Sequence, residues 1–401
     1  MSGADWPSAR AVAYAAGREL GSRLSAAHEV PLAEAAGRVL AAPLFALHPL
    51  PHYASSAMDG WAVSGPGPWR LPAFAAIPTG AVPGVENTLL PGQASPIVTG
   101  GSIPQGATAV LRREHGAEEA GVLRSDHEPP ENKDIRPAAT EATTGTELLP
   151  SGTRLTPAGV AVAALSGHDR VLVAPRIPVR LVFTGGEVTE AGVPGKGFVR
   201  DAFGPVLPAC VSGLGGSVAS AARIGDDFDA TVDAVDGPLA REAAIVVTTG
   251  GTGGSPLDHL RPAARHLGAE PLVDGVAVRP GHPALLARMP DGRLLLSLPG
   301  NPLAALVAVA TLLEPLLRGA AGRPASAPRE ALSATSHAPL PGRHRVVPAR
   351  WAEGSQRGAL MPAAHTGSAM MRGLATADVL LVVPPEGLAA GGPATYLPLP
   401  W

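Results

Sequence analysis

Residues 244–255 read Ala244-Ile245-Val246-Val247-Thr248-Thr249-Gly250-Gly251-Thr252-Gly253-Gly254-Ser255, an apolar run followed at once by a glycine-rich turn. Short apolar runs bounded by glycine are typical of strands buried on both faces of a parallel sheet. Ser255 and Pro256 suit the N-cap and first position of a helix whose buried face includes Leu257 and Leu260. This segment therefore predicts a strand, a turn and a helix, the repeating unit of an α/β domain.

Two further runs of the same kind occupy residues 179–183 and 294–298, and each is followed by glycine, with or without proline. Between residues 178 and 318 these runs alternate with helical segments, which predicts a three-layer α/β domain with a parallel-type sheet. Ligands of such sheets bind outside the carboxyl ends of the strands. We therefore look for chemistry at the three turns.

The turn after residue 248 has few Cβ atoms, so its backbone N–H groups can approach a phosphate. The N-terminus of the helix that follows also attracts an anion. A structural alternative stays open, in which the glycines only form a tight turn and Asp258 only completes a capping box with Ser255.

The other two turns also allow two interpretations. Pro299-Gly300-Asn301-Pro302 opens a helix toward the ligand edge, although Asn301 at N-cap and Pro302 at N1 would explain it structurally. Glu187, in Thr184-Gly185-Gly186-Glu187, is a carboxylate suited to Mg²⁺, although an exposed glutamate is also an ordinary surface group.

The flanking segments predict three further units. Residues 8–47 indicate two helices, and residues 50–137 are rich in proline and glycine with β-type runs at 95–98 and 109–111. Thr156-Pro157 begins another helix, so the β-rich part is an insertion. The predicted domains are a helical linker domain (1–48 and 138–176), an inserted β-rich domain (49–137), the α/β domain (177–323) and a C-terminal β-barrel-like domain (324–401).

Composition excludes several classes of protein. The net charge of −3 and the absence of basic blocks longer than a pair exclude a nucleic-acid binder. The single Cys210 excludes an internal disulfide and fits a reducing cytoplasm.

The apolar run 303–313 is stopped by Glu314 and too short for a membrane, and the first residues lack signal-peptide features, so we expect a cytoplasmic protein. Dinucleotide, P-loop, zinc-protease and serine-hydrolase motifs are absent.

Three segments together carry a family resemblance: Ser56-Ala57-Met58-Asp59-Gly60-Trp61-Ala62, then Val98-Thr99-Gly100-Gly101-Ser102-Ile103-Pro104, then Pro299-Gly300-Asn301-Pro302. The chain resembles the molybdopterin molybdenumtransferase (molybdenum insertase) family, which includes bacterial insertases and the C-terminal domain of gephyrin. The likeness also covers residues 135–137 through the helix at 156, the turn near 250, and residues 365–388.

The resemblance implies an elongated homodimer of four-domain chains. It implies a reaction in which adenylylated molybdopterin and molybdate yield the active cofactor with release of AMP, assisted by Mg²⁺. The site would lie between the α/β domain of one protomer and the inserted domain of the other. The implied partners are enzymes of molybdopterin synthesis and the molybdoenzymes that receive the cofactor.

The resemblance also assigns roles to residues of this sequence. The catalytic positions are Asp59, Thr99, Glu187 and Asp258, of which Glu187 and Asp258 are the ones associated with Mg²⁺. The positions expected to bind the molybdopterin substrate are Thr249, Gly250, Gly251, Thr252, Gly253, Ser255, Arg279, His282, Pro299, Gly300, Asn301, Pro302 and Asp227. For Asp227, an ordinary loop aspartate is the alternative.

The chain departs from the family pattern at four places, one of which is the turn Thr249-Gly250-Gly251-Thr252-Gly253-Gly254-Ser255 in place of Ser-Gly-Gly followed by Ser and Gly. Arg279-Pro280-Gly281-His282-Pro283 replaces a segment with two lysines, Asp201-Ala202-Phe203 replaces Asp-Ser-Asn, and Gly186 replaces an acid. These departures favour an alternative in which the chain is a catalytically weak paralogue that carries molybdopterin or regulates the pathway. A scaffold role, as in gephyrin, is a third alternative.

Overall fold

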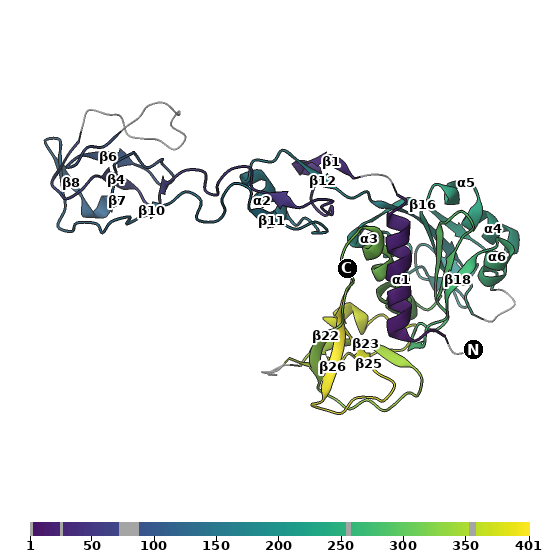
Figure 1. Ribbon diagram of the computed structural model, residues 1–401. Helices are drawn as coiled ribbons and strands as arrows, with labels where there is room; N and C mark the ends of the chain where they lie inside the picture. Colours follow the sequence, from purple (N-terminus) through teal and green to yellow (C-terminus); the bar gives the residue numbers. More distant parts are fainter. Residues whose placement is uncertain (1–2, 25–26, 72–87, 254–257, 353–357) are drawn as a thin grey trace.

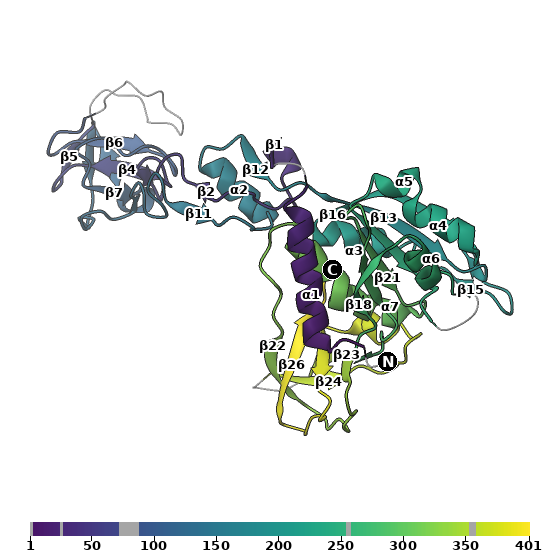
Figure 2. The ribbon, with the colours of Figure 1, turned by 45° about the vertical axis from the view of Figure 1, so that its right-hand side comes forward.

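The computed structural model describes residues 3–24, 27–71, 88–253, 258–352 and 358–401. The chain is elongated, with the inserted β-rich part at one end, a narrow linker in the middle, and the α/β and C-terminal parts together at the other end (Figures 1 and 2). The expected multidomain α/β and β architecture is confirmed.

The α/β part is built on a six-stranded sheet of order β16-β13-β17-β21-β20-β18. The strands are β13 (Ile177–Thr184), β16 (Gly216–Ile224), β17 (Ile245–Thr249), β18 (Glu270–Asp274), β20 (Leu285–Arg288) and β21 (Leu294–Leu298). The three strands predicted from the sequence, β13, β17 and β21, are parallel neighbours, as expected. Because they are parallel, their carboxyl ends meet at one edge of the sheet.

Helices cover both faces of this sheet. They are α3 (Leu207–Leu214), α4 (Phe228–Asp236), α5 (Pro238–Arg241), α6 (Leu260–His266), α7 (Pro302–Ala308) and α8 (Glu314–Ala320). Side chains alternate between two cores, so that Val247 faces the core with α3, α7 and α8, whereas Val246 faces the core with α4, α5 and α6. This alternation produces the three layers.

The segment from α7 to α8 is continuous through a π-helical turn, Val309–Leu313. Glu314 ends the apolar run in the sequence but not the helix, which continues to Ala320 with Glu314 buried and paired with Arg10. Pro315, which cannot donate a backbone hydrogen bond, follows the π turn. Residues Pro302–Ala320 are long and apolar enough to cross a membrane by length and composition, but 94% of that stretch is buried inside the protein.

Helix α1 (Trp6–Gly21) packs along α8, and Trp6, Ala9 and Ala13 join the larger α/β core. The contact is close, because a Cβ at Gly17 would overlap the Leu316 carbonyl oxygen. The second helix predicted within residues 8–47 is wrong. Residues 32–34 form a single 3₁₀ turn, and Gly37, at φ +78°, interrupts any longer helix.

The linker is a small unit of short strands and one helix. Its elements are β1 (His28–Pro31), β2 (Leu44–Phe45), β11 (Glu147–Leu149), α2 (Pro157–Leu165) and β12 (Arg170–Val173). The helix predicted at Thr156-Pro157 is confirmed, with the Thr156 side chain accepting a hydrogen bond from the Gly159 amide at 3.1 Å. The predicted domain boundaries remain a prediction, and the packing of α1 favours placing it with the α/β part.

The inserted part contains two three-stranded sheets, β6-β4-β7 and β5-β9-β8. Their strands are β4 (Gly60–Val63), β5 (Trp69–Arg70), β6 (Ala94–Ile97), β7 (Ala109–Arg112), β8 (Ala117–Glu119) and β9 (Val122–Arg124), and β3 (Ser55–Ser56) pairs with β10 (Ile135–Arg136) nearby. Trp69 and Leu123 are fully buried between the sheets.

The C-terminal part is a closed barrel of five strands. They are β22 (Arg329–Ser333), β23 (His344–Trp351), β24 (Ala359–Pro362), β25 (Val379–Val383) and β26 (Pro393–Pro398), and the pairing of β23 with β25 closes the ring. A further strand, β19 (Val278–Arg279), leaves the α/β part and pairs with β23, placing Arg279 opposite Arg345.

Candidate functional site

The three predicted turns meet in one cleft of about 840 Å³ at the carboxyl ends of β13, β17 and β21. Two hydrogen bonds hold the turns together. The Thr184 hydroxyl donates to the Thr249 carbonyl at 2.6 Å, and the Gly250 amide donates to the Leu298 carbonyl at 3.0 Å. The cleft therefore has a backbone floor fixed by the sheet.

Gly250 is required where these turns touch. Its φ is +79°, and a Cβ there would lie 2.6 Å from the Thr184 hydroxyl oxygen. A Cβ on Gly300, in the neighbouring turn, would lie 3.5 Å from the Gly250 Cα. Side chains at these positions would push the turns apart or fill the floor.

The floor offers backbone donors to an anion. Within the described ranges, the amides of Gly251 and Gly253, both of which line the cleft, donate no backbone hydrogen bond. Asn301 precedes α7 but makes no side-chain cap, so its amide group is available to the cleft. Asn301 therefore occupies the N-cap position of α7, but its side chain does not perform the capping that the structural interpretation requires.

Glu187 and Asp258 both line this cleft. A Cβ on Gly253 would lie 2.8 Å from an Asp258 carboxylate oxygen, and one on Gly185 would lie 3.0 Å from a Glu187 carboxylate oxygen. Each carboxylate is therefore folded back over the glycine-rich turn of its own strand. No group of three or more metal-ligating side chains occurs among the described residues.

The structure separates the two aspartates of the 226–227 pair. Asp227 is the N-cap of α4 and accepts a hydrogen bond from the Ala230 amide at 2.8 Å. Asp226 instead lines the cleft and accepts from the Gly186 amide at 3.3 Å. The sequence analysis singled out Asp227 and missed Asp226, because two adjacent acids carry no signal of which one points inward.

A second group of cleft residues escaped the sequence analysis. Arg223 lines the cleft, pairs with Asp201 at 2.5 Å and lies over the Phe183 ring at 5.4 Å. Asp201 also accepts from the Phe203 amide at 2.8 Å. Arg223 is fixed by these contacts, so it presents a positioned cation to the cleft.

An adjoining pocket of about 550 Å³ shares Pro283, Pro299 and Asn301 with the cleft. Its cationic lining comes from two domains, namely Arg279 and His282 of the α/β part and Arg343 and Arg345 of the barrel. The His282 Nδ1 donates to the Val276 carbonyl at 2.7 Å, which orients the ring. Arg343 and Arg345 were not predicted, since only the barrel packing brings them here.

Arg261 connects the glycine-rich turn to this second pocket. Its Nε donates to the Thr252 carbonyl at 3.4 Å, its Nη2 donates to the Pro283 carbonyl at 3.1 Å, and it forms an ion pair with Asp274. Burial lowers the pKa of this guanidinium, and the nearby Arg265 lowers it further. Arg261 is therefore a positioning residue.

Asp59 and Thr99 form a separate site on the inserted part. The Asp59 Oδ1 accepts from the Thr99 amide at 2.7 Å and from its hydroxyl at 2.9 Å. These two hydrogen bonds lower the pKa of Asp59, backbone donor first, so the carboxylate is ionised near neutral pH. In one chain the strands around this pair lie at the far end of the molecule from the cleft (Figure 1).

Comparison with known proteins covers all parts of the chain. Family models match the MoeA N-terminal region (domain I and II) at residues 8–167, a probable molybdopterin binding domain at 180–319, and the MoeA C-terminal region (domain IV) at 330–399. Molybdopterin molybdenumtransferase 2 of Mycobacterium tuberculosis is 32% identical over 311 residues, which cover 74% of this chain and 75% of that protein. The chain belongs to the molybdopterin molybdenumtransferase family.

Other relatives agree with this membership. The molybdopterin molybdenumtransferase of Synechococcus elongatus is 31% identical over 303 residues, covering 73% of this chain and 75% of that protein. A crystal structure of a molybdopterin biosynthesis MoeA protein from Pyrococcus horikoshii has a TM-score of 0.75 at 20% identity, covering 98% of this chain and 99% of that one. The last comparison establishes the fold.

The structure gathers most of the substrate-binding residues predicted for this molybdopterin molybdenumtransferase family member. The cleft is lined by Thr249, Gly250, Gly251, Thr252, Gly253, Pro299, Gly300, Asn301 and Pro302, together with Glu187 and Asp258. Arg279 and His282 lie in the adjoining pocket. Asp227, Asp59 and Thr99 lie elsewhere, and Ser255 falls outside the described residues.

Proposed function

We propose that this chain joins molybdate to adenylylated molybdopterin and releases AMP. Its family membership makes it a transferase of molybdenum cofactor biosynthesis that inserts molybdenum. The observation that carries the finer proposal is the cleft itself, where three glycine-containing turns meet beside Glu187 and Asp258. In the reaction, water attacks the diphosphate, so a new P–O bond forms as the bridging P–O bond breaks and AMP leaves, and two dithiolate sulfurs replace two molybdate oxygens, which take up protons and leave as water.

The backbone floor suits the diphosphate of the adenylylated substrate. The amides of Gly251 and Gly253 can donate to phosphate oxygens, and the Asp258 carboxylate close to Gly253 would approach the same phosphate through the metal ion. A cleft of about 840 Å³ falls within the roughly 300–1,000 Å³ typical of small-molecule sites. Arg223, held by Asp201, adds a fixed positive charge at the rim.

Glu187 and Asp258 fit Mg²⁺ bound together with that diphosphate. Mg²⁺ usually keeps several waters and takes one or two protein carboxylates plus substrate phosphates. Asp226 and Asp201 also line the cleft, but Asp226 accepts from the Gly186 amide and Asp201 pairs with Arg223, so Glu187 and Asp258 are the two carboxylates we assign to the ion. When bound, Mg²⁺ would neutralise charge on the phosphates as AMP departs.

The adjoining cationic pocket supports molybdate binding. Molybdate is a dianion, and Arg279 and Arg345 are cross-strand neighbours beside His282 and Arg343. Because Asn301 and Pro299 border both spaces, molybdate there would adjoin a substrate in the cleft. Arginine keeps its charge at any working pH, so the replacement of a family lysine by Arg279 preserves the attraction.

Asp59 and Thr99 would complete the site from a second protomer. The linker and the inserted part together form an arm, and the strands around this pair lie at its far end, away from the cleft of the same chain (Figures 1 and 2). An ionised carboxylate there would relay protons from the dithiol to the molybdate oxygens that leave as water. We therefore propose a homodimer, working in the cytoplasm with molybdopterin-synthesis enzymes and molybdoenzymes as partners.

A single-turnover assay with adenylylated molybdopterin, molybdate and Mg²⁺ tests this proposal. We expect AMP release and transfer of active cofactor to an apo-molybdoenzyme, lost in Glu187→Gln and Asp258→Asn. Glu242→Gln, an exposed carboxylate remote from both pockets, is the matched control and should retain activity.

The assay also distinguishes the carrier or regulator alternative. The departure at His282 favours that alternative, since a histidine fixed by Val276 reaches less far than a lysine. Tight molybdopterin binding without AMP release in the wild type would contradict the enzyme and establish a carrier. Full activity in both carboxylate variants would contradict their proposed roles.

A further inference from the structure

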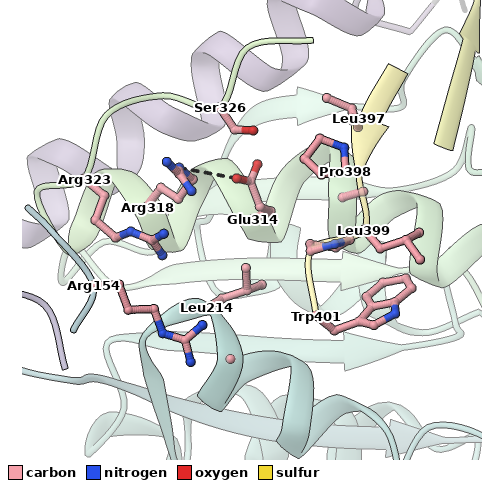
Figure 3. A pocket seen from close by; sticks show the side chains of 13 residues that line it. Arg154, Leu214, Glu314, Arg318, Arg323, Ser326, Leu397, Pro398, Leu399 and Trp401 are labelled. Atoms are coloured by element: carbon pink, nitrogen blue, oxygen red, sulfur yellow. Dashed lines mark ion pairs between the residues drawn. The ribbon is translucent and has the colours of Figure 1, made fainter. Parts of the chain in front are cut away.

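We infer that a second anion site, for a small oxyanion of the phosphate type, lies between the linker, α8 and the C-terminal segment. The pocket has a volume of about 210 Å³ and shares no lining residue with the cleft or its adjoining pocket. Figure 3 shows its arginine side chains on one side and Trp401 with the C-terminal prolines and leucines on the other.

Positive charge dominates this pocket. Arg154 comes from the linker, Arg318 from the end of α8, and Arg323 from the turn that follows α8. Glu314 is the one carboxylate among the described lining residues. Its two oxygens are already engaged, Oε2 with Arg10 at 3.3 Å and Oε1 with Arg318 at 3.4 Å.

The remaining two arginines lack a compensating partner. Within the described parts of the chain, the guanidinium groups of Arg154 and Arg323 make no hydrogen bond or ion pair. Arg323 is partly buried, and burial lowers the pKa of its guanidinium, with Arg318 and Arg154 lowering it further. Of the three arginines among the described lining residues, only Arg318 is paired with the Glu314 carboxylate, so two positive charges stay without an ion-pair partner.

The volume of the pocket and the chemistry of its charged side chains indicate which ligand it would bind. A pocket of about 210 Å³ is smaller than the roughly 300 Å³ at which drug-sized sites begin. Three planar guanidinium groups, contributed to one pocket by different segments, suit the oxygens of a phosphate. Leu397 and Trp401 shield one side from water, which strengthens the attraction between the arginines and an anion.

A bound oxyanion would connect the linker to the α/β part. The two segments already touch, because a Cβ on Gly152 would lie 3.3 Å from the Gly322 carbonyl oxygen. An anion held by Arg154 on one side and by Arg318 and Arg323 on the other would bridge the same junction. Occupancy would therefore stiffen the base of the arm that carries the inserted part.

Hydrogen–deuterium exchange with and without inorganic phosphate tests the site locally. We expect phosphate to slow exchange in residues 150–155 and 320–326 of the full-length protein. Arg154→Gln and Arg323→Gln should each raise the phosphate concentration needed for half-maximal protection at least tenfold, which is on the order of the loss of one charge-assisted hydrogen bond. Arg154 is exposed, so its variant should fold normally, and Arg124→Gln on the inserted part is the matched control.

Two results would overturn the inference. One is phosphate protection confined to the turns near residues 250 and 300, which would mean binding in the cleft alone. The other is protection of residues 150–155 and 320–326 that rises with protein concentration and ignores phosphate, which would mean that a second copy of the chain fills the pocket.

Discussion

An alanine at Gly250 would place a methyl group against the hydroxyl that joins two strand ends. A Cβ there lies 2.6 Å from the Thr184 Oγ1, which donates to the Thr249 carbonyl. The left-handed backbone costs alanine about 1 kcal/mol, and disrupting the buried hydrogen bond adds about 1–3 kcal/mol. We therefore expect Gly250→Ala to lower the free energy of unfolding by about 2–4 kcal/mol, measured by urea denaturation.

Gly251→Ala is a matched control, because Gly251 has a similar φ of +64° but its Cβ would make only ordinary contacts, with Leu260 at 3.6 Å and the Thr184 Oγ1 at 4.0 Å. It should lose only the backbone contribution of about 1 kcal/mol. We also expect Gly250→Ala to lower kcat/KM for AMP release by about a hundredfold, because the displaced turn misplaces the diphosphate. Equal destabilisation by both variants would refute the Thr184 contact, and unchanged kcat/KM would refute the role of the turn.

Three further predictions concern residues around the two sites. Thr99→Val removes one hydrogen-bond donor to Asp59 and should raise the pKa of Asp59 toward its ordinary value, which carboxyl NMR titration would measure. A carboxylate whose pKa is lowered by folding stabilises the fold above its unfolded-state pKa, and this stabilisation is lost as the pH falls through the folded-state pKa. The variant should therefore lose this stabilisation at a higher pH than the wild type. Arg261→Lys keeps the charge but cannot span two carbonyls, so kcat/KM should fall about tenfold with little change in the urea midpoint. Arg10→Met leaves Glu314 buried with weaker pairing and should cost about 3 kcal/mol in urea denaturation, most of it recovered in Arg10→Met with Glu314→Leu.

The sequence predicted the central sheet and its turns because their signals are local. Residues 245–249 and 294–298 are mostly apolar and are followed by glycine or proline, and both strands are buried along their whole length. The helix expected within residues 32–47 failed because periodicity alone ignored Gly37, whose left-handed backbone ends any helix there. Its apolar residues Leu40 and Leu44 instead pack against Val171 and Val173 of the linker.

The site was predictable where it lies on strand ends and unpredictable where tertiary packing builds it. Arg261 belongs to an ordinary helix, and only its reach to Thr252 and Pro283 gives it a role. Arg345 enters the second pocket because β19 pairs with β23 across two domains. No pattern within either segment alone indicates such a contact.

Mixing two inactive variants tests the composite site most directly. Asp59→Asn disables the arm and Glu187→Gln disables the cleft, so each homodimer alone should release no AMP. If the arm of one protomer serves the cleft of its partner, mixed dimers contain one intact site, and an equal mixture of freely exchanging subunits should recover about a quarter of wild-type AMP release. Absence of any recovery, with mixed dimers verified by mass spectrometry, would contradict a site shared between protomers.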